Sequence, residues 1–250
     1  MSPCGQEGLA MARIIKPSSA IIGFGIREGM LTLVDKILRR PSRARQVLSY
    51  VRQNVTPNDP GALLAAMDRF ARDQRFLMNV GDVKGRILLD QLRASGAGNV
   101  LELGTYCGYS AILMASQLKD GGHVDSLELN ADNAAVAREL IEYAGLTDKV
   151  TVHEGAAAAL IPTLTKTYQM VFIDHWKDQY LPDLKVIEDS GVTVVGSVIV
   201  ADNVGMFDAG GYLSHVRESG RYQNSHYDAH MEYSDTIYDA IEVSVVKDSA

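Results

Sequence analysis

Two short stretches of this sequence combine residue types that could perform chemistry. In VFIDHWKDQYLP, residues 171–182, an apolar run ends in four functional side chains. They are Asp174, His175, Trp176 and Lys177. A second apolar run, GSVIVADN, ends in Asp202 and Asn203. If the two runs are adjacent parallel strands, their polar ends meet at one edge of a sheet, where two carboxylates and an amide oxygen would suit Mg²⁺. For Asp202 and Asn203 alone, an Asx turn after a strand is the alternative.

Lys177 is the candidate base of this group. Beside a divalent cation its ammonium form is disfavoured, so the amine could accept a proton. His175 is interpreted as a packing or cofactor-adjacent residue rather than a metal ligand. Trp176, the only tryptophan, could cover the sheet end or form a flat wall for an aromatic substrate.

A glycine-containing loop, LELGTYCGYS, follows the first apolar run after residue 98. The spacing of Gly104 and Gly108 departs from the dinucleotide fingerprint G-x-G-x-x-G. Glu102 would repel a phosphate but attract an ammonium group, and Glu128 ends the next run, where an acid can bond both ribose hydroxyls. This combination indicates S-adenosylmethionine. The alternative is a packing turn beside a solvated strand end.

The segments around these residues predict an α/β fold. Five short apolar runs, at 99–104, 123–130, 149–155, 169–174 and 196–203, alternate with helical patterns, which favours a Rossmann-like, doubly wound, mostly parallel sheet. Two further strand-like runs, at 225–233 and 239–248, have no helical pattern between them. They predict an antiparallel addition at the sheet edge.

The first 96 residues show helical patterns without the alternating apolar runs. We expect a mobile N-terminus over 1–20, helices over 21–96 that pack on the core, and a sheet domain over 97–250, with one compact domain from about residue 42. One helical pattern places Ile26, Met30, Leu33 and Ile37 on a single face. Charged residues interrupt the apolar segment 19–35 too early for a membrane span. An amphipathic helix is therefore predicted there, with peripheral membrane contact as the less favoured alternative.

Composition limits the class of protein. The 250 residues are 46% hydrophobic and 22% charged, as in ordinary globular proteins. A net charge of −7 argues against nucleic-acid binding. Cys4 and Cys107 form neither a disulfide framework nor a zinc-ligand spacing. We expect a cytoplasmic protein without an integral membrane segment, as a monomer or weak homodimer.

Several motifs together resemble the catechol O-methyltransferase family of the S-adenosylmethionine-dependent methyltransferases. These are MNVGDVKG, LELGTYCGYSA, FIDHWKDQYLPD, VIVADNV and HMEY, in order along the chain from about residue 42 to the end. The resemblance implies a seven-stranded sheet with an antiparallel last strand. It also implies Mg²⁺-dependent transfer of a methyl group from S-adenosylmethionine to one hydroxyl of a catechol.

The resemblance further implies roles for individual residues. The metal ligands would be Asp174, Asp202 and Asn203, and the catalytic group Lys177, Glu232 and Asn203. The cofactor would contact Met78, Val80, Glu102, Gly104, Tyr106, Ser110, Glu128, Leu129, Gly155, Ala156, Ala157, Asp174, His175 and Trp176. The acceptor would contact Phe76, Met78, Asp174, Trp176, Lys177, Asn203, Phe207 and Glu232.

The chain departs from the family pattern at Phe76, Phe207, Ala157 and Ala158. The first two keep the acceptor slot apolar but alter its width, and the two alanines offer the adenine only backbone groups. One alternative function is a Mg²⁺-dependent O-methyltransferase for caffeoyl thioesters or flavonoids. Another is a non-catalytic module that binds S-adenosylmethionine, although such a module would need neither Lys177 nor Glu232. A nicotinamide oxidoreductase is disfavoured by the loop spacing.

Overall fold

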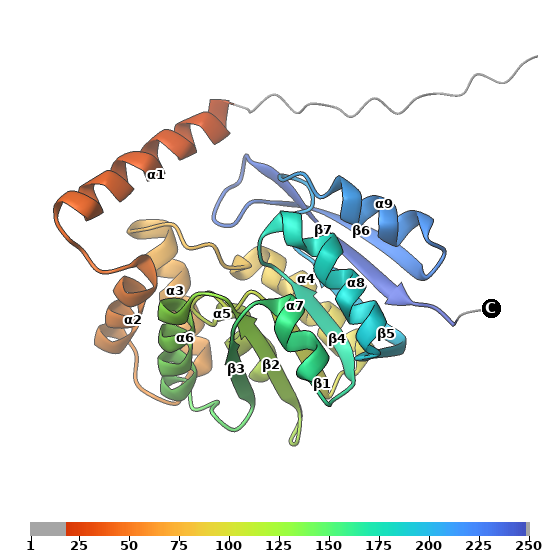
Figure 1. Cartoon of the computed structure of the whole chain (residues 1–250). Coiled ribbons are helices and arrows are strands. Elements are labelled where there is room, and N and C mark those ends of the chain that lie inside the picture. The colour runs from red at the N-terminus through yellow and green to blue at the C-terminus, as the bar shows by residue number, and fades with distance from the viewer. Residues whose placement is uncertain (1–18, 249–250) are drawn as a thin grey trace, which may run out of the picture.

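A computed structural model describes residues 19–248 of the chain. Its centre is a seven-stranded sheet with strand order β3-β2-β1-β4-β5-β7-β6 (Figure 1). The strands are β1 Asn99–Leu103, β2 His123–Glu128, β3 Val150–Glu154, β4 Tyr168–Ile173, β5 Thr193–Ala201, β6 Tyr222–His230 and β7 Tyr238–Val246. The predicted mixed sheet is confirmed, including the number of strands.

The direction of the strands changes at one side of the sheet. β1 pairs in parallel with β2 and β4, and β4 pairs in parallel with β5. β7 runs antiparallel to both β5 and β6 and lies between them. The carboxyl ends of β1, β2, β4 and β5 therefore lie at the same edge, where ligands bind in doubly wound sheets.

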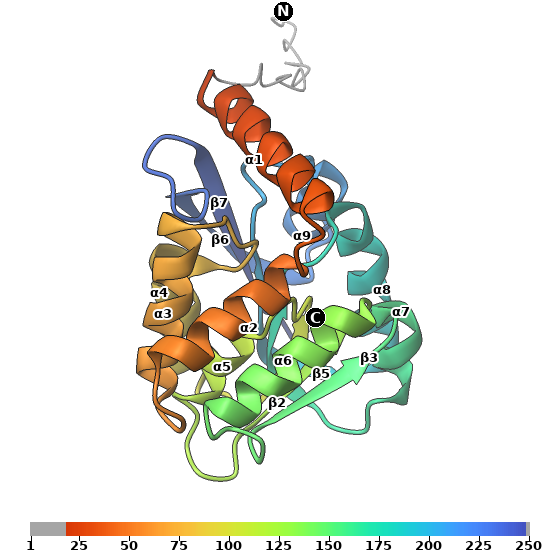
Figure 2. The ribbon, with the colours of Figure 1, turned by 90° about the vertical axis from the view of Figure 1, so that its left-hand side faces the viewer.

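Helices cover both faces of this sheet, and Figure 2 shows the layers from the side. The helices are α1 Ser19–Ile37, α2 Arg43–Asn54, α3 Pro60–Asp73, α4 Gly81–Ser95, α5 Tyr109–Ala115, α6 Ala131–Tyr143, α7 Ala157–Leu160, α8 Tyr180–Ser190 and α9 Gly210–Glu218. Two short 3₁₀ turns, Ile161–Thr163 and Lys177–Gln179, precede β4 and α8. One apolar core joins α2–α6 to one face, and a second joins α8 and α9 to the other.

Local sequence signals explain where the predicted helices begin and end. The side chain of Asp59 accepts a hydrogen bond from the backbone of Ala62 and caps α3, whose first residue is Pro60. Gly96 ends α4 in the left-handed conformation, with φ 60°. The central strands β1 and β4 are buried on both faces, which is why they appear in the sequence as mostly apolar runs.

The first helix differs from the others in which of its sides meets the protein. α1 lies at the periphery of the fold (Figures 1 and 2), and Ile26, Met30, Leu33 and Ile37 share one face as predicted. That face points away from the protein, since these four side chains are 59–70% exposed. The partly buried positions are instead Ile21, Phe24, Glu28, Leu31 and Asp35. Within residues 19–248, no helix is long and apolar enough to cross a membrane.

The predicted division of the chain is not tested by these contacts and stays a prediction. The predicted mobile segment 1–20 falls almost wholly outside the described residues, which start at the first turn of α1.

Candidate active site

The ends of β4 and β5 carry the first group of predicted site residues. Asp174 follows the last residue of β4, and Asp202 and Asn203 follow the last residue of β5. The backbone N–H of Asp202 donates to the carbonyl of Ile173 at 3.0 Å, which extends the β4–β5 pairing to this point. Asn203 adopts a positive φ of 52°, a strained conformation that asparagine tolerates better than most residues.

The side chains of these residues converge. The Lys177 ammonium group lies 3.0 Å from Asn203 Oδ1 and 3.7 Å from Asp174 Oδ1. Burial raises the pKa of Asp174 well above its usual range, and the nearby charge of Asp202 raises it further. Asp202 Oδ2 is buried and has no hydrogen-bond partner among the described residues. Closely spaced carboxylates with an unsatisfied oxygen are what a small divalent cation would stabilise, so the predicted residues fit Mg²⁺.

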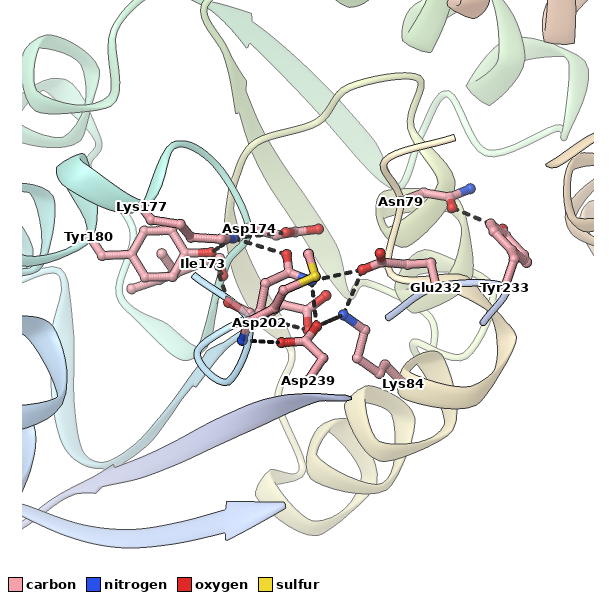
Figure 3. Close-up of polar contacts among 12 residues, drawn as sticks. Asn79, Lys84, Ile173, Asp174, Lys177, Tyr180, Asp202, Glu232, Tyr233 and Asp239 are labelled. Atoms are coloured by element: carbon pink, nitrogen blue, oxygen red, sulfur yellow. Dashed lines mark hydrogen bonds and ion pairs between the residues drawn. The ribbon is translucent and has the colours of Figure 1, made fainter. Parts of the chain in front are cut away.

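A buried lysine lies next to this group (Figure 3). Lys84 Nζ, from α4, lies 2.7 Å from Asp202 Oδ1, 2.6 Å from Glu232 Oε1 and 2.7 Å from Asp239 Oδ2. The lysine side chain is 1% exposed. The three carboxylates are close enough to chelate an ion, but the ammonium group already occupies the space among them. The other oxygen of Asp202, Oδ2, which Lys84 does not contact, is therefore the better candidate metal ligand.

Asn203 joins the two parts of the site. Its side-chain nitrogen donates to Glu232 Oε1 at 2.8 Å and to Asp239 Oδ2 at 2.7 Å, while its oxygen accepts from Lys177. The carboxyl of Asp202 is held by Lys84 on one oxygen, as described above. Ion pairs and hydrogen bonds with Lys84 and Lys177 thus hold the oxygen atoms that are predicted to bind the metal.

Lys177 has a defined environment at the start of the short helical turn after β4. Its Nζ donates to the Tyr180 hydroxyl at 2.5 Å and lies 4.5 Å from the centre of that ring. Tyr180 is buried and donates in turn to the carbonyls of Ile173 and Asp202. The amine is held at the ends of β4 and β5 and is still 15% exposed, so it can exchange a proton with a bound acceptor.

The predicted cofactor side of the site begins with Glu102 on β1. Its carboxyl is completely buried, one oxygen accepts from the Ser126 hydroxyl, and Oε1 lacks a partner among the described residues. Burial raises the pKa of Glu102 to about 7, against the opposing effect of the Ser110 and Ser126 hydroxyls. A buried acid without compensation is suited to receive an ammonium group.

The glycine loop is held between β1, β2 and β4. Gly104 has φ 101°, and a Cβ at this position would overlap the carbonyl oxygen of Asp174. Glu128 accepts from the backbone N–H of Tyr106 at 2.8 Å and of Asn130 at 2.8 Å. Tyr106 has a positive φ of 47°, which is rare for a bulky residue. The strained backbone lies where the sequence analysis places the cofactor.

The remaining predicted site residues differ in exposure. Exposed side chains are Met78, Leu129, Trp176 and Phe207, while Val80 and Ser110 are buried. Phe76 is half-buried and meets Phe24 of α1 edge to face, with ring centres 4.9 Å apart. Gly155, Ala156 and Ala157 form the turn from β3 into α7. The roles of these residues in binding stay predictions.

His175 faces α8 rather than the oxygen ligands. Its Nε2 lies 2.7 Å from Asp183 Oδ2 on α8, and its ring stacks on Tyr180 at 5.2 Å. This arrangement agrees with the interpretation of a packing or cofactor-adjacent residue.

Sequence reasoning did not assign a role to Lys84, Asp239 or Tyr180. Lys84 occurs within the motif MNVGDVKG, but an isolated lysine in a helical pattern resembles a solvated residue. Asp239 opens the apolar run of β7, where a single acid suggests a strand end. Their pairing across 155 positions of the sequence arises only in the folded chain.

Comparisons with known proteins agree with this geometry. A family model described as O-methyltransferase matches residues 57–214. The chain belongs to the O-methyltransferase family. Catechol O-methyltransferase of Mus musculus is 38% identical over 230 residues, which cover 90% of this chain and 86% of the mouse protein. Catechol O-methyltransferase B of Danio rerio is 41% identical over 213 residues, covering 83% and 80% of the two chains.

Solved structures support the same assignment of the fold. An O-methyltransferase from Bacillus cereus, solved in complex with SAH, has a TM-score of 0.63 and 25% identity, covering 86% of this chain and 96% of that one. A putative O-methyltransferase from Klebsiella pneumoniae, at 22% identity, has a TM-score of 0.62 and covers 87% and 96%. The resemblance found in the sequence, the methyltransferase class and the Rossmann-like O-methyltransferase fold are thereby confirmed.

Proposed function

We propose that this O-methyltransferase transfers a methyl group from S-adenosylmethionine to one hydroxyl of a catechol, with Mg²⁺ bound at the ends of β4 and β5. The observation that carries the proposal is the position of Lys177 Nζ, within 3.0 Å of Asn203 Oδ1 and 3.7 Å of Asp174 Oδ1. A base thus lies beside the oxygen ligands that would hold a diol. The catechol-methylating relatives match most of the chain, which supports the same acceptor class.

Three residues would hold the metal, and two acids would bind polar groups of the cofactor. Asp174, Asp202 and Asn203 offer the oxygen ligands, and the free Asp202 Oδ2 is available for the ion. Glu102 would bind the ammonium group of the cofactor. Glu128 would bind its ribose, as well as holding the glycine loop. When bound, S-adenosylmethionine supplies the methyl carbon, and Mg²⁺ supplies positive charge beside the acceptor oxygens.

The residues of the chain would then move one proton and orient the acceptor. Lys177 Nζ accepts the proton of the reacting hydroxyl, whose oxygen becomes the nucleophile for the methyl carbon. Because the positive charge of the sulfonium would be neutralised by the transfer, Lys177 would keep the proton at Nζ and then return it to solvent. Glu232 would accept a hydrogen bond from the second hydroxyl. Its own position is fixed by Lys84 and Asn203, both of which contact Oε1. Alignment of the reacting groups should supply much of the rate acceleration.

An acceptor screen with labelled S-adenosylmethionine tests this proposal. Catechol, a caffeoyl thioester and a flavonoid are compared with Mg²⁺ and with excess chelator. We expect transfer to catechol that requires the metal. Transfer that persists in the chelator would exclude the metal site, and preference for the thioester or flavonoid would reassign the acceptor. If cofactor binds but no acceptor is methylated, the chain is a binding module.

Two lysine variants, one in the site and one outside it, test whether Lys177 is the base. Lys177→Met should lower turnover of catechol by about 10²- to 10⁴-fold while cofactor binding is retained. Lys185 is the matched control, because it is an exposed lysine of α8 and Lys185→Met should leave turnover unchanged. Equal rates for Lys177→Met and the control would show that Lys177 is not the base.

We further propose that the protein works in the cytoplasm as a monomer or weak homodimer and does not bind nucleic acid. Its acidic net charge of −7 supports the last point. Sedimentation velocity over a range of protein concentrations would reveal a stable dimer.

A further inference from the structure

The first helix turns an apolar stripe toward solvent along its whole length. The stripe consists of Ile22, Ile26, Met30, Leu33 and Ile37, whose side chains are 51–70% exposed. Their spacing of three and four residues places them on one side of a helix with about 3.6 residues per turn. A continuous exposed apolar stripe of this kind marks an interaction surface rather than ordinary surface residues.

The polar side of the same helix is the side that binds the protein. Glu28 forms an ion pair with Arg43 at 3.0 Å, and Asp35 forms one with Arg75, which is 6% exposed. Arg75 also donates to the carbonyl of Leu31 at 3.3 Å. These buried contacts fix the rotation of α1 about its own axis, so the apolar stripe is held outward.

The charges beside the stripe all have the same sign. Both acids of α1 are directed inward and paired, as described above. Arg27 and Lys36 are exposed and lie about a quarter turn from the stripe, one on each side. Arg39 and Arg40 follow at the C-terminal end of the helix and are also exposed. A basic surface therefore borders the stripe, although the whole chain carries a net charge of −7.

From this arrangement we propose that α1 binds an anionic lipid surface, with its axis parallel to the membrane. The stripe enters the boundary between headgroups and acyl chains, and Arg27 and Lys36 contact acidic headgroups from either side. The helix is too polar to cross the bilayer. Its peripheral position in the fold lets a flat surface reach the stripe (Figures 1 and 2).

Charge also argues against a second copy of this chain as the occupant. If two copies paired by the same stripe about a twofold axis, each would place its basic border against that of its partner. Repulsion between these borders would oppose the dimer, whereas the negative surface of a membrane attracts both.

Vesicle sedimentation tests the proposal with the full chain. We expect the protein to bind vesicles of phosphatidylcholine with roughly one quarter phosphatidylserine, and to bind pure phosphatidylcholine several-fold more weakly. Ile26→Glu with Leu33→Glu should lower binding to the mixed vesicles by about tenfold or more, because two side chains of the stripe become charged. Arg27→Glu with Lys36→Glu should abolish the preference for phosphatidylserine.

Val195 provides the matched control, because it is 61% exposed at the start of β5, far from α1 in the sequence. Val195→Glu should leave vesicle binding unchanged, and all three variants should keep the methylation rate of the wild type. Failure of the wild type to bind mixed vesicles would overturn the proposal, as would equal binding by the Ile26/Leu33 variant. If that variant instead dissociates a dimer without affecting vesicle binding, the stripe binds a second copy and the proposal is wrong.

Discussion

Replacing Lys84 by methionine removes one positive charge from a buried cluster while nearly preserving side-chain volume. In the wild type, the ammonium group lies 2.6–2.7 Å from Asp202, Glu232 and Asp239, which are 0–7% exposed. Without it, three carboxylates remain with oxygens within 4.8 Å of one another. At an effective dielectric constant of about 20, each pair of charges repels by about 3–4 kcal/mol.

Proton uptake by one of the three carboxylates would partly relieve their repulsion. The expected loss of stability is therefore smaller than the sum of the three pairwise repulsion energies. Removing one partner of a buried ion pair generally costs about 3–5 kcal/mol. For a protein of this size, such a loss corresponds to a decrease in Tm of about 10 °C. Burial already raises the pKa of Asp202 to about 6, and Lys84 opposes that rise, so the variant should hold a proton on Asp202 at higher pH.

The loss should also depend on pH in a defined direction. In the folded variant the pKa of Asp202 lies further above its unfolded value. The folded state then binds more protons than the unfolded state between these two values, and stability falls as pH rises through that window. Lys84→Met should therefore be destabilised more at pH about 8 than at pH about 5.

Thermal unfolding at both pH values measures the effect. Lys119, an exposed lysine, supplies the control variant Lys119→Met, which should melt like the wild type. Adding Asp239→Asn to Lys84→Met removes one of the repelling charges and should recover part of the lost stability. Melting of Lys84→Met within about 2 °C of the wild type, or a further loss in the double variant, would refute the electrostatic reasoning.

Three further predictions concern the cofactor and acceptor sides of the site. Because the pKa of Glu102 is about 7 in the free protein, binding of an ammonium group should release a proton below that pH, and cofactor affinity should rise from pH about 6 to about 8. Calorimetry in buffers of different ionisation enthalpy measures the proton, and Glu102→Gln should abolish this pH dependence. Gly104→Ala should lower cofactor affinity by at least about tenfold, because the new methyl group overlaps the Asp174 carbonyl; equilibrium dialysis that finds wild-type affinity would contradict this close approach. Phe24→Ala removes the edge contact to Phe76 and should raise the KM for catechol several-fold with little change in kcat, whereas an unchanged KM would place Phe76 outside the acceptor slot.

The fold was predictable because local and tertiary signals agree. The cap at Asp59 and the left-handed Gly96 mark the ends of two helices, and mostly apolar runs identified the central strands β1 and β4, which are buried on both faces. The fifth strand begins three residues before the predicted run, at Thr193. The predicted run begins at Gly196, but the strand continues through this glycine to Val194 and Val195, which are exposed and lie where the pairing with β4 is irregular.

The candidate site was predictable where its residues end adjacent strands. Asp174, Asp202 and Asn203 could be brought together from topology alone. Lys84 and Asp239 could not be placed in the site in this way. Lys84 lies in a helix, Asp239 lies at the start of β7, and the two are buried together only in the folded chain. The direction of the α1 stripe also escaped prediction, since an amphipathic pattern identifies an apolar face but not what that face contacts.

The insertion of β7 between β5 and β6 has a consequence for biosynthesis. Glu232 precedes β7 and Asp239 lies within it, so residues 232–246 complete both the sheet and the charge cluster around Lys84. A nascent chain whose residues 232–246 are still in the exit tunnel must therefore hold Lys84 without two of its carboxylates, and β6 without its neighbour. Methyl transfer should begin only after β7 has left the ribosome, and a stop codon before residue 238 should yield a protein that neither closes its sheet nor methylates.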